Sequence, residues 1–217
     1  MNYTLILGNK NYSSWSMRAW LLLRFLDLKF KEININLYTK TSRAEVKALG
    51  VQTGKVPALQ DNDIIIWDSL AIVEYLYESF PAIWPQERDK RVLARSFCCE
   101  IHSGLNALRS AMPVNIRERG IGVEITDAVR QDIERVAEIW NFCTSSYSGP
   151  WLMGDFCVLD IFYAPVATRF RTYNVKLEPA TQDYCDKILH HPLVTEWCEL
   201  SKQDQSTLDI FETEQTR

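Results

Sequence analysis

The stretch Gly54-Lys55-Val56-Pro57-Ala58-Leu59 is the part of the sequence on which the predicted fold depends. It is typical of a Gly-Lys turn followed by a short apolar strand. Proline donates no hydrogen bond to a β-ladder, so Pro57 fits only the first residue of a strand or an edge strand. If the Val56–Pro57 bond is cis, the chain turns sharply and the N–H and C=O of Val56 point outward. We therefore predict that an extended peptide can pair with the main chain of Val56.

Outward from this stretch, strands and helices alternate over the first eighty residues. Strands are predicted over residues 3–7, 30–37, 56–60 and 64–67, and helices over 13–26, 41–50 and 68–79. The Ser42 and Glu45 spacing predicts a capping box at the start of the second helix. The element order is β-α-β-α-β-β-α, in which the first two strands form a right-handed parallel unit and the last two form a hairpin.

Beyond residue 80 the apolar spacing is helical throughout. One helix is predicted over residues 93–112, a second over 129–143, a third over 158–172 and two shorter ones around His191-Pro192. The polar residues 203–217 are expected to fray. The predicted fold class is α/β plus all-α, with an α/β domain at 1–80, a linker at 81–88 and an all-helical domain at 89–217.

Composition narrows the classes of function. The net charge of −4 and the pI of about 5.5 argue against a nucleic-acid-binding protein, which needs a basic face. No apolar run approaches the roughly 20 residues of a membrane span, and no secretory signal is visible at the N-terminus. Six cysteines follow no metal-binding spacing, which predicts reduced thiols, a cytoplasmic protein and no metal site: Cys98, Cys99, Cys143, Cys157, Cys185 and Cys198.

Four motifs keep a consistent order over nearly the whole chain: Tyr12-Ser13-Ser14-Trp15-Ser16-Met17-Arg18, Gly54 to Leu59, Asp68-Ser69, and Gly154 to Asp160 with Pro165. Together they resemble the cytosolic glutathione transferase superfamily, whose members have a thioredoxin-like N-terminal domain and a helical C-terminal domain. The serine-rich first motif is similar to bacterial, zeta and theta-like branches. The resemblance implies a homodimeric detoxification enzyme that uses glutathione as co-substrate and adds it to a small hydrophobic electrophile.

The hydroxyl groups near the first helix start are the candidates for activating glutathione. A thiol titrates near 8.5, and one donated hydrogen bond at the positive end of a helix favours the nucleophilic thiolate. Ser14 is the first choice because it precedes Arg18 by four residues, as in theta-like members. Ser13 takes the cysteine position of related transferases, and Tyr12 is third. The alternative is that these residues only cap the helix.

The resemblance also implies how glutathione is bound. The Val56–Pro57 main chain would hold the cysteinyl backbone of glutathione. At the γ-glutamyl end, Ser69 suits a carboxylate at a helix start and Asp68 suits an ammonium group. Lys40 and Lys55 are cations that could meet the glycyl carboxylate, and either could equally be a solvated surface lysine.

The electrophile is expected between the domains, with Ser103, Arg109 and Phe162 as candidates that the sequence does not rank. Asp160 is interpreted as a folding residue and Cys157 as a small buried residue, because a thiol is a poor cap acceptor. The three histidines are assigned no role.

Three other functions are compatible with the fold that the resemblance implies. A glutathione-dependent isomerase, of the maleylacetoacetate isomerase kind, would use the same thiolate. A non-catalytic interaction or regulatory module is disfavoured by the intact Ser14, Pro57 and Ser69. Thiol–disulfide exchange ranks last, because the first eighty residues contain no cysteine.

Overall fold

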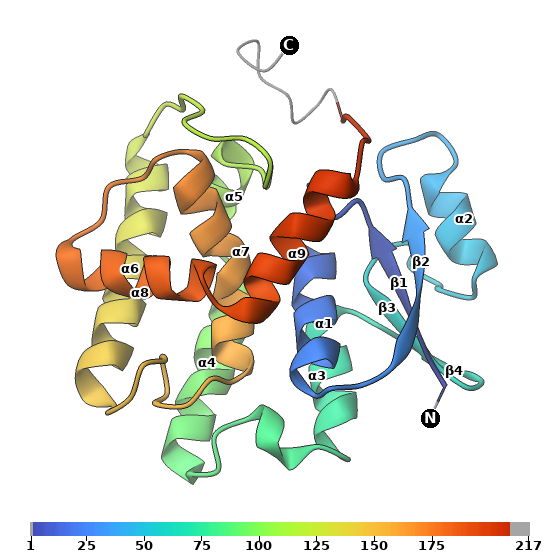
Figure 1. The fold of residues 1–217 in the computed structure, drawn as a ribbon, viewed down its shortest axis with the longest axis horizontal. Helices are drawn as coiled ribbons and strands as arrows, with labels where there is room; N and C mark the ends of the chain where they lie inside the picture. Colours follow the sequence, from blue (N-terminus) through green and yellow to red (C-terminus); the bar gives the residue numbers. More distant parts are fainter. Residues whose placement is uncertain (1, 209–217) are drawn as a thin grey trace.

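A computed structural model describes residues 2–208 of the chain (Figure 1). A mixed four-stranded sheet forms in the first third of the chain. The strands are β1 (Tyr3–Gly8), β2 (Phe30–Ile35), β3 (Ala58–Asp61) and β4 (Ile64–Trp67), and their order is β2-β1-β3-β4. Strand β1 is parallel to β2 and antiparallel to β3, and β3 forms a hairpin with β4. The predicted parallel unit and hairpin are confirmed. Strand β3 begins after Pro57, which has no N–H for the ladder.

Side chains alternate across the sheet and give it two covered faces. On one face, Leu5 and Leu7 of β1 pack with α1 (Ser14–Phe25) and α3 (Ser69–Tyr77). On the other face, Ile6 belongs to a smaller cluster with Val46 of α2 (Ser42–Ala48). The predicted capping box of α2 is wrong, because the helix is preceded by Thr41, whose hydroxyl binds the Glu45 carboxylate instead.

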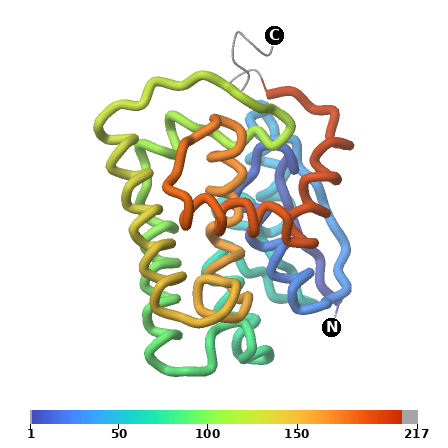
Figure 2. The backbone as a smooth tube through the Cα atoms, turned by 60° about the vertical axis from the view of Figure 1, so that its left-hand side comes forward, coloured from blue at the N-terminus to red at the C-terminus, as the bar shows by residue number. Residues whose placement is uncertain are grey.

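The rest of the described chain is helical. Its helices are α4 (Arg88–Ser103), α5 (Asn106–Ala111), α6 (Asp127–Ser146), α7 (Val158–Thr172), α8 (Pro179–Leu189) and α9 (Pro192–Gln203), preceded by the 3-10 turn η1 (Pro81–Ile83). Helix α7 is buried along nearly its whole length and packs against α1, α4 and α8, while α9 crosses to the sheet side and contacts α1 (Figures 1 and 2). The thioredoxin-like and all-helical fold class is confirmed, and the boundaries at 80 and 89 stay a prediction.

The single helix predicted over 93–112 is wrong, because the chain breaks between α4 and α5. Leu105 adopts a left-handed conformation with φ of 56°, which no α-helix continues through. A Cβ atom at Gly104 would lie 2.8 Å from the carbonyl oxygen of Glu100, so the break requires glycine there. Helix α5 is held in its new direction by α6, because Asp132 Oδ2 accepts a hydrogen bond from the Leu108 N–H at 2.9 Å.

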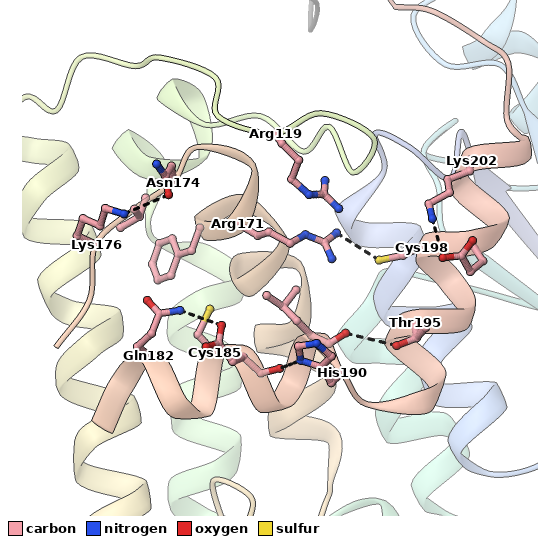
Figure 3. Close-up of a pocket in the computed structure, with 15 residues that line it drawn as sticks. Arg119, Arg171, Asn174, Lys176, Gln182, Cys185, His190, Thr195, Cys198 and Lys202 are labelled. Atoms are coloured by element: carbon pink, nitrogen blue, oxygen red, sulfur yellow. Dashed lines mark hydrogen bonds and ion pairs between the residues drawn. The ribbon is translucent and has the colours of Figure 1, made fainter. Parts of the chain in front are cut away.

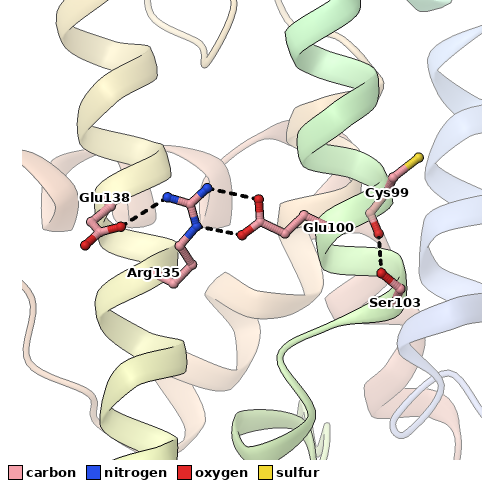
Figure 4. A network of polar contacts seen from close by, with 5 residues as sticks. All are labelled: Cys99, Glu100, Ser103, Arg135 and Glu138. Carbon is pink, nitrogen blue, oxygen red and sulfur yellow. Dashed lines mark hydrogen bonds and ion pairs between the residues drawn. The ribbon is translucent and has the colours of Figure 1, made fainter.

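An ion-pair network fixes the end of α4 against α6 (Figure 4). Arg135 on α6 donates two hydrogen bonds to Glu100 on α4, at 2.6 and 3.0 Å, and one to Glu138 at 3.1 Å. One turn further along α4, the Ser103 hydroxyl donates to the Cys99 carbonyl at 2.9 Å. The network holds the last turn of α4 in place, and that turn forms a wall of the candidate site.

The segment after α9 returns to the sheet side. Arg117 Nη2 donates to the Ser206 carbonyl at 2.9 Å, and Asn9 Nδ2 donates to the Ser206 hydroxyl at 2.7 Å. The prediction of fraying is therefore wrong for residues 204–208, while residues 209–217 lie outside the described part of the chain. Within residues 2–208, none of the helices has both the length and the apolar character that a bilayer crossing needs.

Candidate functional site

Two adjoining cavities open at the N-terminus of α1. The larger has a volume of about 790 Å³ and lies between the α1 start, the loop before Pro57 and helices α4, α5 and α7. The smaller, of about 410 Å³, reaches the start of α3. Trp15, Lys55, Val56 and His102 line both cavities, which therefore form one continuous site.

Ser13 is the N-cap of α1. Its oxygen accepts a hydrogen bond from the Ser16 N–H at 3.2 Å, and its hydroxyl donates to Ser16 Oγ at 2.8 Å. Ser16 Oγ in turn accepts from the Gly8 N–H at 2.9 Å, which ties the helix start to the end of β1. The hydroxyl hydrogen of Ser13 is thus engaged within the fold.

Ser14 lines the larger cavity and has a different partner. Arg169, from the last turn of α7, donates from Nη2 to Ser14 Oγ at 3.4 Å. Arg169 is buried and also donates to two backbone carbonyls, those of Met112 at 2.8 Å and Pro165 at 3.2 Å. Since Ser14 accepts this bond, its own hydroxyl hydrogen is left to donate toward the cavity.

Arg169 was not predicted from the sequence, although its position in the largely apolar stretch 158–172 is a visible signal. Its pKa is lowered to about 9, by burial first and then by the nearby positive charge of Arg109. It stays largely protonated at neutral pH and places a positive charge beside Ser14.

The third hydroxyl candidate, Tyr12, is part of a link between the two ends of the described chain. Arg117 Nη2 donates to the Tyr12 oxygen at 2.9 Å, and the backbone N–H of Leu208 donates to it at 3.4 Å. Asn11 beside it donates to Asn115 Oδ1 at 2.8 Å. These contacts position the loop that carries the serines.

The smaller cavity brings together the binding residues predicted around the hairpin. The Val56–Pro57 bond is cis, as the sequence analysis required. Among the residues that the structure describes, none hydrogen-bonds the Val56 main chain. Ser69, at the start of α3, is 2% exposed, and its hydroxyl has no partner within residues 2–208. Unpartnered buried hydroxyls are rare, so the cavity offers Ser69 Oγ to a ligand.

Asp68 is the N-cap of α3 and faces the same cavity. Its Oδ1 accepts from the Leu70 N–H at 2.8 Å, and its Oδ2 lies 3.1 Å from Nε2 of His102 on α4. Burial lowers the pKa of His102, as do the charges of Arg18 and Arg109, while Asp68 acts in the opposite direction. His102 is therefore neutral near pH 7 and donates from Nε2. This pair has no local signal in the sequence, because its members are 34 positions apart.

Trp15 forms the floor between the two cavities. Its ring lies against the guanidinium groups of Arg109, at 4.2 Å, and Arg18, at 4.5 Å. Its edge meets the His102 ring at a centroid distance of 5.0 Å. Arg18 is fully buried and donates from Nε to the Phe162 carbonyl at 3.2 Å.

Two predicted residues lie elsewhere. Phe162 is 1% exposed and packs on Arg18, so it belongs to the core and lines neither cavity, whereas Ser103 and Arg109 do line the larger one. Lys40 is exposed on the loop before α2 and is absent from both linings, whereas Lys55 lines both.

The predicted folding residue Asp160 is completely buried in α7. It accepts hydrogen bonds from the backbone of Leu152 at 3.1 Å, from the backbone of Cys157 at 3.0 Å and from the Tyr184 hydroxyl at 2.9 Å. Burial raises the pKa of Asp160 to about 6, although these three donors act against the shift. Cys157 is also buried, and burial raises the pKa of its thiol well above the usual value. The interpretation of both as packing residues agrees with this geometry.

Another cavity, of about 610 Å³, lies between the end of α7, α8 and α9 (Figure 3). Its cations have partners of their own: Lys202 pairs with Glu199 at 2.7 Å, and Arg171 donates to Cys198 Sγ at 3.5 Å. None of the residues predicted to bind glutathione lines it.

Comparison with known proteins points to one family. Residues 7–87 match the model of the glutathione S-transferase N-terminal domain. The chain is 27% identical over 159 residues to "Glutathione S-transferase L2, chloroplastic" of Arabidopsis thaliana, covering 72% of this chain and 50% of the relative, so it spans about half of that protein's length. It is 26% identical over 172 residues to a "Probable maleylacetoacetate isomerase" of Caenorhabditis elegans, covering 76% of this chain and 78% of the relative.

Solved structures agree on the fold. A glutathione transferase homolog from Burkholderia gl BGR1, crystallised with bound glutathione, superimposes with a TM-score of 0.72 at 22% identity. The match covers 94% of this chain and 100% of that chain. At this identity the likeness establishes the shared fold.

Proposed function

Because the chain belongs to the cytosolic glutathione transferase superfamily, we propose that it binds glutathione across the two adjoining cavities and activates the thiol for attack on an electrophile. The observation that carries this proposal is the Ser14–Arg169 contact at the start of α1. In this contact the Ser14 hydroxyl hydrogen is left to donate to the sulfur of glutathione, and the positive charge of Arg169 lies next to Ser14.

The smaller cavity suits the γ-glutamyl and cysteinyl parts of the tripeptide. The Val56 N–H and C=O would pair with the cysteinyl backbone, as an added strand does. Ser69 Oγ and the N-terminal amides of α3 suit the γ-glutamyl carboxylate, because helix N-termini favour anions. Asp68, oriented by His102, would accept from the ammonium group, and Lys55 would meet the glycyl carboxylate.

Sulfur activation then follows from three effects at one point. The Ser14 hydroxyl donates to the sulfur, the α1 N-terminus contributes a partial positive charge, and Arg169 adds a full one. All three favour the thiolate over the thiol. The engaged hydroxyl of Ser13 supports Ser14 as the sulfur ligand and so supports a serine-type transferase.

Binding and turnover test the proposal separately. We expect glutathione to bind in calorimetry and the protein to conjugate it to chlorodinitrobenzene. Ser69→Ala should weaken glutathione binding about tenfold, because a hydrogen bond to a carboxylate is lost. Ser79→Ala, in the exposed turn after α3, serves as the matched control. A protein that neither binds glutathione nor is retained on glutathione-agarose would refute the proposal.

Glutathione-dependent isomerisation is the second candidate, favoured by the likeness to the relative named as a probable maleylacetoacetate isomerase. The same thiolate would add to the substrate, allow rotation about the former double bond and leave again. Isomerised substrate with no loss of free glutathione distinguishes this reaction from conjugation. A non-catalytic module would bind glutathione but do neither.

We also propose a detoxifying homodimer in the cytoplasm. All six cysteines are unpaired, which fits a reducing compartment. Ile64 on β4, Val92 on α4 and Phe142 on α6 are large exposed apolar residues, and such residues are often covered at subunit interfaces. Light scattering coupled to size exclusion tests the dimer, and a monomer at micromolar concentration would contradict it.

A further inference from the structure

One wall of the larger cavity is polar and basic, although the sequence analysis expected a hydrophobic electrophile there. The end of α4 and helix α5 contribute Ser103, Asn106, Arg109 and Ser110 to this wall, and α7 contributes Arg169. Pro113 and Val114 are its apolar members. No aspartate or glutamate is among the described residues that line the cavity.

Arg109 is a cation of this wall that has no counterion among the described residues. Its guanidinium carbon lies over the Trp15 ring, 4.2 Å from the ring centroid, and its Nη1 donates to the His102 carbonyl at 3.4 Å. No ion pair links it to a carboxylate within residues 2–208, whereas Arg95 and Arg135 on the surface each pair with glutamate. Half-burial lowers the pKa of Arg109. An arginine fixed by stacking, with its charge unmatched, is suited to a negatively charged ligand.

The neighbouring arginines add to this imbalance. Arg18 and Arg169 are buried near Arg109, and each has its pKa lowered to about 9, by burial first and then by the other guanidinium groups. None of the described carboxylates pairs with either of them. Three positive charges of this kind stabilise a bound anion more than surface charges do, because solvent screens them less.

The proposed binding of glutathione leaves Arg109 unused. In that arrangement the thiolate is served by Ser14 and Arg169, and the two carboxylates are served by Ser69 and Lys55. Arg109 lines the larger cavity and is absent from the lining of the smaller one. Its partner is therefore expected on the second substrate.

On the premise of the proposed function, we propose that the second substrate is an electrophile that carries a carboxylate, and that Arg109 binds this carboxylate. Ser103, Asn106 and Ser110 supply further hydrogen bonds. For an unsaturated carbonyl compound, the thiolate sulfur forms a C–S bond to the β-carbon while the C=C π bond breaks. The α-carbon then takes a proton from solvent, so the addition needs no oxidant and releases no leaving group.

Ethacrynic acid and its methyl ester test this proposal, because they share a reactive centre that is remote from the carboxylate. The quantity measured is kcat/KM for each compound divided by its uncatalysed rate constant with glutathione. We expect the wild type to favour the acid by about 10- to 100-fold, as for a hydrogen-bonded charge pair. Arg109→Gln should bring the ratio of acid to ester close to one, and Arg109→Lys should keep part of it. Arg130→Gln, which removes an exposed charge on α6, should leave the ratio as in the wild type.

The outcomes separate this inference from the function on which it rests. A wild type that turns over the ester as well as the acid, or an Arg109→Gln variant with the wild-type ratio, overturns the anionic substrate alone. The wild-type ratio needs no variant, so the test holds even if Arg109→Gln folds poorly. Turnover of neither compound, together with no heat of glutathione binding, overturns the proposed function and this inference with it.

Discussion

Replacement of Ser14 by alanine tests the proposed activation of the thiol most directly. The variant removes the hydroxyl that we propose donates to the sulfur of glutathione, and it leaves Arg169 and the helix in place. Ser14 is at the first position of α1 and is not its cap, so the helix start should survive. We therefore expect glutathione to bind while its thiol loses acidity.

The size of the effect follows from the geometry. A hydrogen bond to a charged acceptor contributes about 1.5–3 kcal/mol, which corresponds to a rise of about 1–2 units in the pKa of the bound thiol. The Arg169 Nη2–Ser14 Oγ distance is 3.4 Å, so a sulfur bonded to Oγ lies about 6 Å from the guanidinium. At an effective dielectric of about 20, that charge is worth about 3 kcal/mol, and it stays in the variant. The thiol should therefore remain more acidic than free glutathione.

The assay is a pH titration of the thiolate ultraviolet absorbance in the protein–glutathione complex, with S-methylglutathione as the blank. In parallel, kcat/KM with chlorodinitrobenzene should fall about 10- to 100-fold near pH 7 and recover at alkaline pH, where the thiol ionises without help.

Ser13→Ala is the matched control, because it removes a neighbouring hydroxyl with a different task. It should lower the free energy of unfolding by about 1 kcal/mol through loss of the N-cap and leave the pKa of the thiol unchanged. If Ser13→Ala raises the pKa and Ser14→Ala does not, the assignment of the two serines is reversed. If neither variant changes it, the hydroxyl mechanism is refuted.

Three further predictions concern stability and charge. Asp160→Ala should lower the free energy of unfolding by more than about 3 kcal/mol in urea titrations, because it leaves three buried donors without an acceptor. As a control, Asp183→Ala at an exposed position should change the free energy of unfolding by less than about 0.5 kcal/mol. A small effect at Asp160 would contradict its folding role. Arg135→Ala should lower the free energy of unfolding by at most about 1 kcal/mol, since the Arg135 side chain is 42% exposed. A larger loss of stability would mean that the α4–α6 network contributes more than its exposure implies. Folding lowers the pKa of His102, so as the pH falls the unfolded chain binds a proton at this residue before the folded chain does. The stability that neutral His102 contributes is therefore present above about pH 6.5 and is lost as the pH falls. The wild type should lose stability relative to His102→Gln between about pH 7 and 5. An NMR titration midpoint for His102 above 6.5 would show that the sign is wrong.

Much of the fold was predictable because apolar spacing records it locally. The alternation of side chains in β1 and the helical spacing of apolar residues in α6 and α7 each depend on neighbouring residues. The order of the four motifs indicated the family resemblance. The break between α4 and α5 was missed because the apolar face continues through it. The backbone at Leu105 changes direction while Leu108 still meets the core.

In the candidate site, too, the residues in local motifs were predictable and those that depend on distant contacts were not. Val56, Asp68 and Ser69, which line the smaller cavity, could be predicted as candidates because each sits in a local motif. Arg169 and His102 were missed because their partners lie 155 and 34 positions away, and only packing of α7 and α4 against the sheet domain brings them together. Ser103 and Arg109 were named as candidates for the electrophile pocket, but the sequence did not rank them and did not show that Arg169 joins them in one basic wall.

The contact of Arg117 with both Tyr12 and the Ser206 carbonyl has a consequence for how this molecule is made. During translation the loop bearing Ser13 and Ser14 emerges early, yet Arg117 and Ser206, which fasten it, are synthesised much later. A nascent chain in which Ser206 has not yet been synthesised could have its sheet assembled while that loop remained unsecured. Glutathione capture should therefore mature only once Arg117 and Ser206 have been synthesised and have reached the loop.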